Sequence, residues 1–389
     1  MHRGLESRFR AFYGRDAEVV VRAPGRVNLI GEHTDYSLLP VMPAAIDLAT
    51  TVAAIATEDG QITATSLSVG NEQPAQVLRG LPQMATSGWQ RYLGGVLAEL
   101  DGYRPDAGAM LLVDSNLPLA GGLSSSSSLT VGLLLCLSEV WGLELDRELI
   151  CERAIAAERR LGVEGGGMDQ AIILYAEAGS ALRIDFLPPE KRCVPFAKEL
   201  RLIVASSGAT AQKGGAAMSH YNDRVRACRE AAATLAQQLG LDPAPSITIG
   251  DVVHRSGIDL DHLLAHARRL PEQRSRDAVD HVIGEALRVD RFEAAMRDCD
   301  HAAIGALLDA SHRSLAEKYH CSTPALDRLC AAMRDAGALG ARLTGAGFGG
   351  YAMAIAPANA VDGVLTAAKR ACGGPAMRVH LEAAAQRVS

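Results

Sequence analysis

Five consecutive serines, Ser124 to Ser128, follow two glycines in the stretch "LPLAGGLSSSSSLTVG". Serine runs beside glycine are common in flexible tethers, whose flanks are usually polar as well. Here the run lies between an apolar segment over 110–116, which is typical of a strand, and "LTVGLLLCLSEVWG", which is apolar on nearly every face and predicts a buried helix. The serines therefore occupy a strand-to-helix junction inside a folded unit, and the fold must be built around that junction.

A junction of this kind supplies the chemistry of a phosphate loop. Gly121 and Gly122 allow the backbone to approach a ligand closely, and the first N–H groups of the helix lack intrahelical partners. The helix dipole favours an anion at the same place, while serine hydroxyls can donate to phosphate or bind Mg²⁺. An N-capped tight turn is the structural alternative. The common phosphate loop G-x-x-x-x-G-K-[ST] is excluded, because the sequence contains no Gly-Lys pair.

The composition narrows the class of protein. The chain has 389 residues, of which 48% are hydrophobic and 22% charged, which allows two domains and opposes disorder. A net charge of −6 opposes a broad nucleic-acid surface, so we expect no nucleic-acid partner. Eight cysteines are scattered singly without C-x-x-C, which predicts reduced thiols in a cytoplasmic protein. The N-terminus lacks the apolar core of a signal peptide and no apolar run is long enough for a bilayer, so we expect no membrane contact.

Strand and helix patterns alternate irregularly along the chain. We expect strand, turn and strand over "AEVVVRAPGRVNLIG", and a hairpin at Asp59-Gly60 in the β-rich stretch that follows. The second half begins with a strand near Ile203, continues with helices, and ends as strand, glycine loop, strand, helix and strand. This order predicts an α+β fold in two lobes, 1–195 and 196–389, rather than a doubly wound sheet.

The glycine loop near the C-terminus, "GAGFGG" at 345–350, formally matches G-x-G-x-x-G. A dinucleotide site needs a helix directly after this motif. The following "YAMAIA" is typical of a strand, so the dinucleotide interpretation fails. A glycine-rich hairpin and a backbone wall beside a ligand both remain open.

Polar residues gather between apolar strands in "RAPGRVNLIGEHTDY". Glu32, His33, Thr34 and Asp35 combine carboxylates, an imidazole and a hydroxyl, which suits hydrogen bonding to several hydroxyls of a sugar. Turn capping and solvent exposure are the structural alternatives. A metal site is a further option, but these residues lack the usual ligand spacing.

A second pair of carboxylates lies in "AAERRLGVEGGGMDQA". Glu158 falls on an expected helix, and Asp169 begins another segment after the glycines at 165–167. In the structural interpretation, Asp169 caps a helix. In the functional one, Glu158 binds a cation while Asp169 acts on a substrate hydroxyl reached past the glycines.

Three segments together resemble the signatures of the GHMP family of small-molecule kinases, and specifically its galactokinase branch. They are "GRVNLIGEHTDY", "LPLAGGLSSSSSL" and "LTGAGFGGYAMAI", in this order, and the resemblance spans nearly the whole chain. "GVEGGGMDQ" and "MSHYNDRVRAC" also resemble segments that galactokinases share with N-acetylgalactosamine kinases. The resemblance implies a two-lobed α+β structure with its active site in the cleft between the lobes.

The resemblance also implies a role for each matching residue. Asp169 would be the catalytic carboxylate beside the anomeric hydroxyl, and Arg26 would lie near Asp169 and the transferred phosphoryl group. Ser126 and Glu158 would bind Mg²⁺. The residues that would hold the sugar hydroxyls are Glu32, His33, Thr34, Asp35, Gly166 and Tyr221. Those that would contact ATP are Gly121, Gly122, Leu123, Ser124, Ser125 and Ser126 around the phosphates and Trp89 near the adenine.

The sequence departs from the family pattern at two places. Ala120 replaces the first glycine of the serine loop. Ser37 and Leu39 replace an asparagine and a glycine that usually follow the sugar signature, so the identity of the sugar is the open question.

We expect a monomer that phosphorylates D-galactose at the anomeric oxygen with ATP and Mg²⁺. An N-acetylgalactosamine 1-kinase is the nearest alternative, because the glycines at 165–167 would leave room for a larger substituent. Another hexose or uronate 1-kinase is a further alternative. A catalytically silent sugar sensor is the alternative of a different class, and Ser126, Glu158, Asp169 and Arg26 argue against it because all four are present.

Overall fold

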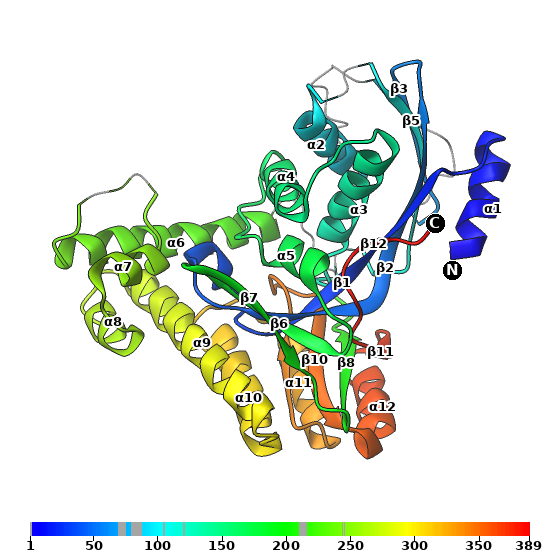
Figure 1. Ribbon diagram of the computed structural model, residues 1–389. Coiled ribbons are helices and arrows are strands. Elements are labelled where there is room, and N and C mark those ends of the chain that lie inside the picture. The colour runs from blue at the N-terminus through cyan, green and yellow to red at the C-terminus, as the bar shows by residue number, and fades with distance from the viewer. Residues whose placement is uncertain are drawn as a thin grey trace.

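The structure is a computed structural model that describes residues 2–68, 75–78, 88–103, 106–119, 121–209, 216–242, 244 and 246–389. It confirms a mixed α+β fold, in which two main sheets are each covered by helices (Figure 1). In this part of the chain, no helix is both long and apolar enough to cross a bilayer. All eight cysteines are free thiols.

The first sheet has the strand order β12-β1-β2-β5-β3-β4. Its strands are β1 (Val19–Ile30), β2 (Met42–Thr57), β3 (Gln61–Ser66), β4 (Ala75–Leu78), β5 (Gly108–Ser115) and β12 (Gln386–Arg387). Figure 1 shows α1 (His2–Tyr13) on one side of this sheet and α3 (Ser125–Val140) on the other. The remaining helices of this half are α2 (Gln90–Leu100), α4 (Arg147–Arg159) and α5 (Met168–Tyr175).

The predicted buried helix after the serines is α3. Its side chains are apolar nearly all round because it packs against β1 and β2 on one side and against α2, α4 and α5 on the others. This burial makes the strand-to-helix junction a fixed point of the fold.

Two local predictions for this half are wrong. The expected strand, turn and strand form one continuous strand, β1, whose register against β2 shifts between Pro24 and Gly25. A bulge accommodates a proline, which cannot donate to the ladder, without ending the strand. The expected hairpin at Asp59-Gly60 is a chain reversal only, because β5 lies between β2 and β3 and pairs in parallel with β3. The apolar β5 pairs with the equally apolar β2 along eight residue pairs, which a turn motif does not predict.

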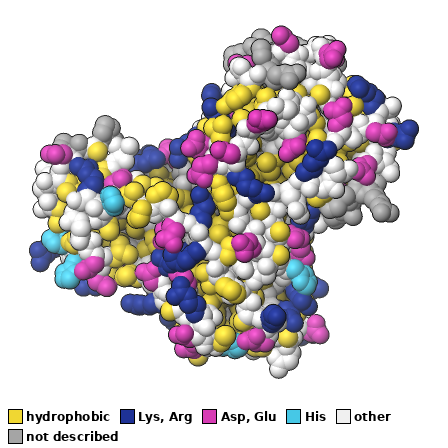
Figure 2. Space-filling view, viewed as in Figure 1, with side chains coloured by type: hydrophobic (Ala, Val, Ile, Leu, Met, Phe, Trp, Pro, Cys, Tyr) yellow, Lys and Arg dark blue, Asp and Glu magenta, His cyan; other side chains and the backbone are white. Residues whose placement is uncertain are grey.

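The second sheet has the order β11-β8-β10-β9. Its strands are β8 (Leu200–Ser206), β9 (Gly340–Leu343), β10 (Tyr351–Pro357) and β11 (Ala376–Val379). β8 is the strand predicted near Ile203, and the other three are those predicted at the end of the sequence. A separate hairpin joins β6 (Ser180–Phe186) to β7 (Pro189–Pro195). The helices of this half are α6 (Ala216–Gln238), α7 (Ile249–Ser256), α8 (Leu260–Ala267), α9 (Gln273–Arg297), α10 (His301–Glu317), α11 (Pro324–Asp335) and α12 (Val361–Cys372). In Figure 2 the surface is hollowed between the part that carries α2 to α4 and the arm that α6 to α8 form.

The two halves share a hydrophobic core. Val27 and Leu29 of β1 belong to the same buried cluster as Leu202 of β8, Met353 of β10 and Phe292 of α9. The polar segment that follows β1 therefore lies where both halves meet. The lobe boundary at residue 195 stays a prediction.

Candidate active site

One pocket brings together the sugar signature, the serine loop and the glycine loop. The predicted site residues that line it are Arg26, Glu32, His33, Asp35, Gly122, Ser126, Glu158, Asp169 and Tyr221. Residues from both halves of the chain contribute, since Thr344, Ala346, Gly347 and Gly349 form part of the wall. The glycine loop is thus a backbone wall of the pocket, which was one of its two interpretations.

Asp169 and Arg26 form an ion pair in this pocket. The Nε of Arg26 donates to Oδ1 of Asp169 at 2.7 Å, and the hydroxyl of Ser124 donates to Oδ2 at 2.5 Å. Arg26 also donates to the carbonyl oxygen of Gly122. Burial lowers the pKa of Arg26, but Asp169, Glu32 and Asp35 outweigh this effect and raise it above its ordinary value. The guanidinium therefore remains charged beside Asp169.

Asp169 lies in the first turn of α5, where the helix dipole favours a carboxylate. The interpretation of Asp169 as the helix cap is wrong, because Gly167 is the N-cap residue, with a φ of 106°. A positive φ of this size is readily adopted by glycine alone. The glycine before Met168 thus allows the turn that aims Asp169 into the pocket.

The serine loop and the glycine loop are in direct backbone contact. A Cβ on Gly122 would lie 2.8 Å from the carbonyl oxygen of Thr344, and one on Gly121 would lie 2.9 Å from the ring of Tyr351. The amide of Tyr351 donates to the carbonyl oxygen of Gly121 at 3.1 Å. Leu123 is buried in the core that the halves share. Gly121 and Leu123 therefore shape the loop without lining the pocket.

The serines differ in what they contact. Ser124 adopts a φ of 59° and makes no side-chain cap to α3, since its hydroxyl is directed to Asp169. Ser125 is the first residue of the helix, and Ser126 lines the pocket. Ser128 donates to the carbonyl oxygen of Ala23 at 2.8 Å and serves packing. The hydroxyl of Ser124 therefore points to the carboxylate of Asp169, whereas the sequence predicts that it contacts a phosphate.

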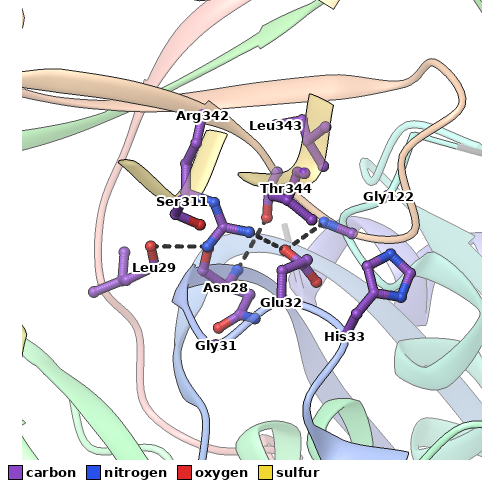
Figure 3. Close-up of polar contacts among 12 residues, drawn as sticks. Asn28, Leu29, Gly31, Glu32, His33, Gly122, Ser311, Arg342, Leu343 and Thr344 are labelled. Atoms are coloured by element: carbon purple, nitrogen blue, oxygen red, sulfur yellow. Dashed lines mark hydrogen bonds and ion pairs between the residues drawn. The ribbon is translucent and has the colours of Figure 1, made fainter. Parts of the chain in front are cut away.

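Glu32 and His33 are buried at the start of the sugar signature. Oε2 of Glu32 accepts from Nη2 of Arg342 at 2.5 Å (Figure 3). The same oxygen accepts from the amide of Gly345 at 3.0 Å. Burial raises the pKa of Glu32, and Arg342 and Arg26 oppose that rise. Burial lowers the pKa of His33 to about 3, so its imidazole is neutral.

The tautomer of His33 follows from its neighbours. Its Nε2 lies 3.3 Å from the carbonyl oxygen of Ala346, which can only accept, so Nε2 carries the proton. Its Nδ1 lies 3.0 Å from the hydroxyl of Tyr36 and accepts from it. The hydroxyl of Tyr36 in turn lies 2.7 Å from that of Tyr319. A chain of buried phenols therefore orients the His33 ring.

Asp35 is fixed by the glycine segment. The amide of Gly166 donates to Oδ2 of Asp35 at 3.0 Å. Burial, and then the nearby charge of Asp169, raise the pKa of Asp35 to about 6. A Cβ on Gly166 would lie 2.2 Å from the carbonyl carbon of Asp35, so this glycine is required for close backbone packing.

The structure does not bring every predicted residue to the pocket. The hydroxyl of Thr34 is fully buried and faces the carbonyl oxygens of Gly31 and Pro40 at 2.9 and 2.8 Å. Trp89 precedes α2 and packs against the core of the first half, whereas Arg91 and Tyr92 of the same segment line the pocket. The roles of Thr34 and Trp89 toward ligands stay predictions.

Two of the three departures from the family pattern, Ser37 and Leu39, can be placed in the structure. Leu39 packs in the core of the second half. A Cβ on Gly250 would lie 2.8 Å from the carbonyl oxygen of Ser37 and 2.7 Å from that of Leu38, so α7 packs closely against this turn. Neither Ser37 nor Leu39 lines the pocket. Ala120 lies outside the described residues.

Sequence reasoning missed the groups that support the site. Arg342 on β9 and Glu285 on α9 are fully buried and contact the segment that carries Glu32. Their sole signal in the sequence is a charged residue among apolar neighbours in "ALGARLTG" and "HVIGEALR".

Comparisons with known proteins match this arrangement. Family profiles match the galactokinase galactose-binding signature over 7–55, the GHMP kinase N-terminal domain over 91–177 and the GHMP kinase C-terminal domain over 292–374. The galactokinase of Homo sapiens is 34% identical over 382 residues, 95% of this chain and 91% of the relative. That of Streptomyces coelicolor is 35% identical over 371 residues, 94% of this chain and 91% of the relative.

Solved structures of GHMP kinases resemble the whole fold of this chain. Lactococcus lactis galactokinase complexed with galactose has a TM-score of 0.87 at 26% identity, over 99% of both chains. Methanococcus jannaschii mevalonate kinase has a TM-score of 0.66 at 18% identity, over 95% of this chain and 99% of that one, which establishes a shared fold.

Proposed function

The chain belongs to the galactokinases of the GHMP kinase family, and from this premise we propose that its pocket transfers the γ-phosphoryl group of ATP to the anomeric oxygen of D-galactose. The observation that carries the proposal is the position of Asp169. Its carboxylate is held by Arg26 and Ser124 between the sugar signature on one side and the serine loop on the other.

Each of the pocket residues has a separate role in the proposed reaction. Glu32 and Asp35 offer acceptors to the sugar hydroxyls, and the neutral imidazole of His33 forms part of the pocket wall beside them. Asp169 orients the anomeric hydroxyl, which is more acidic than an ordinary alcohol, and accepts its proton as the oxygen attacks the γ-phosphorus. The bond from that phosphorus to the β–γ bridging oxygen breaks, and ADP leaves. Arg26 stabilises the charge on the transferred group, because phosphoryl transfer depends on positioning and charge neutralisation.

Ser126 and Glu158 fit a Mg²⁺ site. They line the same pocket and supply a hydroxyl and a carboxylate oxygen, which are donors that Mg²⁺ prefers. Mg²⁺ is usually bound through one or two protein oxygens and completes its coordination with substrate phosphates and water, so two protein donors suffice. When bound, Mg²⁺ would neutralise charge on the phosphates.

The similarity to galactokinases, one of them solved as a complex with galactose, favours galactose over N-acetylgalactosamine. Gly166 is packed against the backbone of Asp35, whereas a Cβ on Gly165 at the pocket wall would meet nothing within 4 Å. A silent sensor is disfavoured because Arg26, Ser126, Glu158 and Asp169 line one pocket. We propose that the chain acts in the cytoplasm, which its eight unpaired cysteines support, and that it acts as a monomer.

The test is ADP release measured with galactose, N-acetylgalactosamine, galacturonate, glucose and mevalonate. We expect rapid turnover with galactose and at most slow turnover with the others. Preferred use of N-acetylgalactosamine would contradict the assignment of galactose as the substrate. Near-zero turnover on every sugar would overturn the kinase proposal.

A further inference from the structure

A buried arginine outside the predicted site contacts the sugar signature from behind. Arg342 of β9 is fully buried. Its Nη1 donates to the carbonyl oxygens of Asn28 and Leu29 at 3.3 and 3.0 Å, and its Nη2 donates to Glu32 at 2.5 Å. Figure 3 shows that one Glu32 oxygen receives this bond while the other is directed away from Arg342, toward the side of His33. The guanidinium thus holds both the backbone and the carboxylate of the segment.

A buried glutamate holds the same segment from α9. Oε1 of Glu285 accepts from the amides of Gly31 and Glu32 at 3.1 and 3.2 Å and from the hydroxyl of Ser311 at 2.6 Å. Its other oxygen accepts from Arg288 at 2.6 Å. Glu285 Oε1 also lies 4.0 Å from Arg342. Three elements of the second half, β9, α9 and α10, therefore meet at the backbone of 28–32.

We propose that Arg342 and Glu285 are positioning residues for sugar recognition. Arg342 favours the ionised form of Glu32 and binds one of its oxygens, so that the other is presented as an acceptor for one hydroxyl of the sugar. Glu285 holds the backbone amides of Gly31 and Glu32. This inference rests on the proposed function and deepens it, because it names the groups that set the charge and direction of a sugar-binding carboxylate.

The electrostatic reason is specific to the charge of Glu32. A carboxylate removed from water favours its protonated form, which donates where the ionised form accepts. Burial raises the pKa of Glu32, and Arg342 is the largest opposing influence, followed by Arg26. Without Arg342, the pKa of Glu32 would move further upward and protonation would compete with sugar binding.

The other titratable groups near this site do not replace Arg342. His281 of α9 donates from Nε2 to the carbonyl oxygen of Glu32 at 3.1 Å, and burial lowers its pKa to about 4, so it is neutral. His33 is neutral as well. Glu285 is ionised, with a pKa of about 2, because Arg288 and Arg342 outweigh its burial. Other charged or titratable groups of the described residues also lie near the site. They are Arg26 of β1, Asp35 of the loop after β1, Asp169 of α5, Tyr221 and Arg224 of α6, and Cys321, which precedes α11.

A merely structural ion pair would behave differently in one measurable respect. If Arg342 only joined β9 to β1, its loss would lower stability and change kcat or both KM values together. If it sets the charge of Glu32, its loss raises the KM for galactose alone, and more so at acidic pH. The distinguishing readout is therefore the pH dependence of the galactose KM.

The experiment compares Arg342→Met and Arg342→Lys with Arg183→Met as the matched control. Arg183 is also a buried arginine in an ion-pair network, with Asp185, Asp290 and Glu293, but it does not line the pocket. For Arg342→Met we expect the galactose KM to rise at least about tenfold at neutral pH and further under mild acid, with the ATP KM within about twofold of wild type. Arg342→Lys keeps the charge, so the pH dependence of its galactose KM should lie between that of the wild type and that of Arg342→Met. Arg183→Met should leave both KM values unchanged.

Two results for Arg342→Met would overturn the proposal. One is a parallel rise of the KM values for galactose and ATP, and the other is a galactose KM whose pH dependence equals that of the wild type. If Arg342→Met does not fold, galactose titration of Arg342→Lys and of Glu285→Gln by calorimetry decides, and unchanged affinity in both refutes it. Turnover by the wild type is a separate test of the proposed function. If another sugar of the panel proves to be the substrate, the same KM comparison is made with that sugar.

Discussion

The substitution Gly166→Ala adds one methyl group at the contact between the glycine segment and the sugar signature. The new Cβ would lie 2.2 Å from the carbonyl carbon of Asp35 and 2.4 Å from the amide nitrogen of Tyr36, both backbone atoms. Gly166 does not adopt a positive φ, so alanine is compatible with its backbone conformation. The effect of the substitution is therefore steric.

The distance by which the two backbones must separate determines how much activity is lost. Ordinary contacts begin near 3.4 Å, so the two backbones must separate by roughly 1 Å, and the Gly166–Asp35 hydrogen bond of 3.0 Å is lost. A hydrogen bond to a charged group contributes about 1.5–3 kcal/mol, which corresponds to about a 10- to 100-fold loss in kcat/KM for galactose. The atoms that the new Cβ would displace belong to Asp35 and Tyr36 rather than to the serine loop, so the KM for ATP should stay within about twofold of wild type.

The neighbouring residue supplies the control. Nothing lies within 4 Å of a Cβ built on Gly165, which also lacks a positive φ. Gly165→Ala should therefore keep kcat/KM for galactose within about twofold of wild type. Steady-state ADP release with varied galactose and varied ATP measures both variants.

The reasoning would be refuted by two results. One is a Gly166→Ala enzyme with the kinetics of wild type, which would mean that the backbone contact does not position Asp35. The other is equal damage in both variants, which would mean that loss of glycine flexibility, rather than contact, is responsible.

Three further predictions concern the reacting groups. Asp169→Asn should lower kcat by roughly two or more orders of magnitude with ATP binding retained in calorimetry, and near-normal turnover would remove Asp169 from the mechanism. Ser124→Ala should lower kcat about tenfold and leave the ATP KM unchanged in steady-state assays, since the hydroxyl donates to Asp169; a raised ATP KM with normal kcat would assign the hydroxyl to phosphate. The pH profile of kcat/KM for galactose should fall below about pH 6 as Asp35 takes up a proton. A profile that stays flat well below that pH would contradict this assignment.

Local chemistry made much of the site predictable. The serine run could be placed at a strand-to-helix junction because its flanks are apolar, and α3 begins at Ser125. The carboxylates and imidazole of the sugar signature are adjacent in the chain, so their gathering needs no knowledge of the fold. Asp169 was identifiable because glycines precede it in "GVEGGGMDQ".

What depends on distant parts of the chain was not predictable. The direction of the Ser124 hydroxyl follows from the left-handed backbone at that residue and from a partner 45 positions away. Arg342 and Glu285 have no local motif, and their role appears once β9 and α9 pack behind Glu32. The insertion of β5 between β2 and β3 is likewise a choice of pairing partner that no turn sequence determines.

Two buried carboxylates, Asp35 of the sugar signature and Glu285 of α9 behind it, have opposite effects on the stability of the fold. Asp35 has its pKa raised from 3.8 to about 6, so its contribution is present below the unfolded value and lost as pH rises through 6. At neutral pH the ionised Asp35 therefore destabilises the fold, on the order of 3 kcal/mol. Glu285 has its pKa lowered from 4.5 to about 2, so it stabilises the fold above the unfolded value by a similar amount, on the order of 3 kcal/mol, which is lost as pH falls through 2. At neutral pH the two effects therefore oppose each other, and a glutamate that does not line the pocket stabilises the fold while the ionised aspartate of the pocket destabilises it.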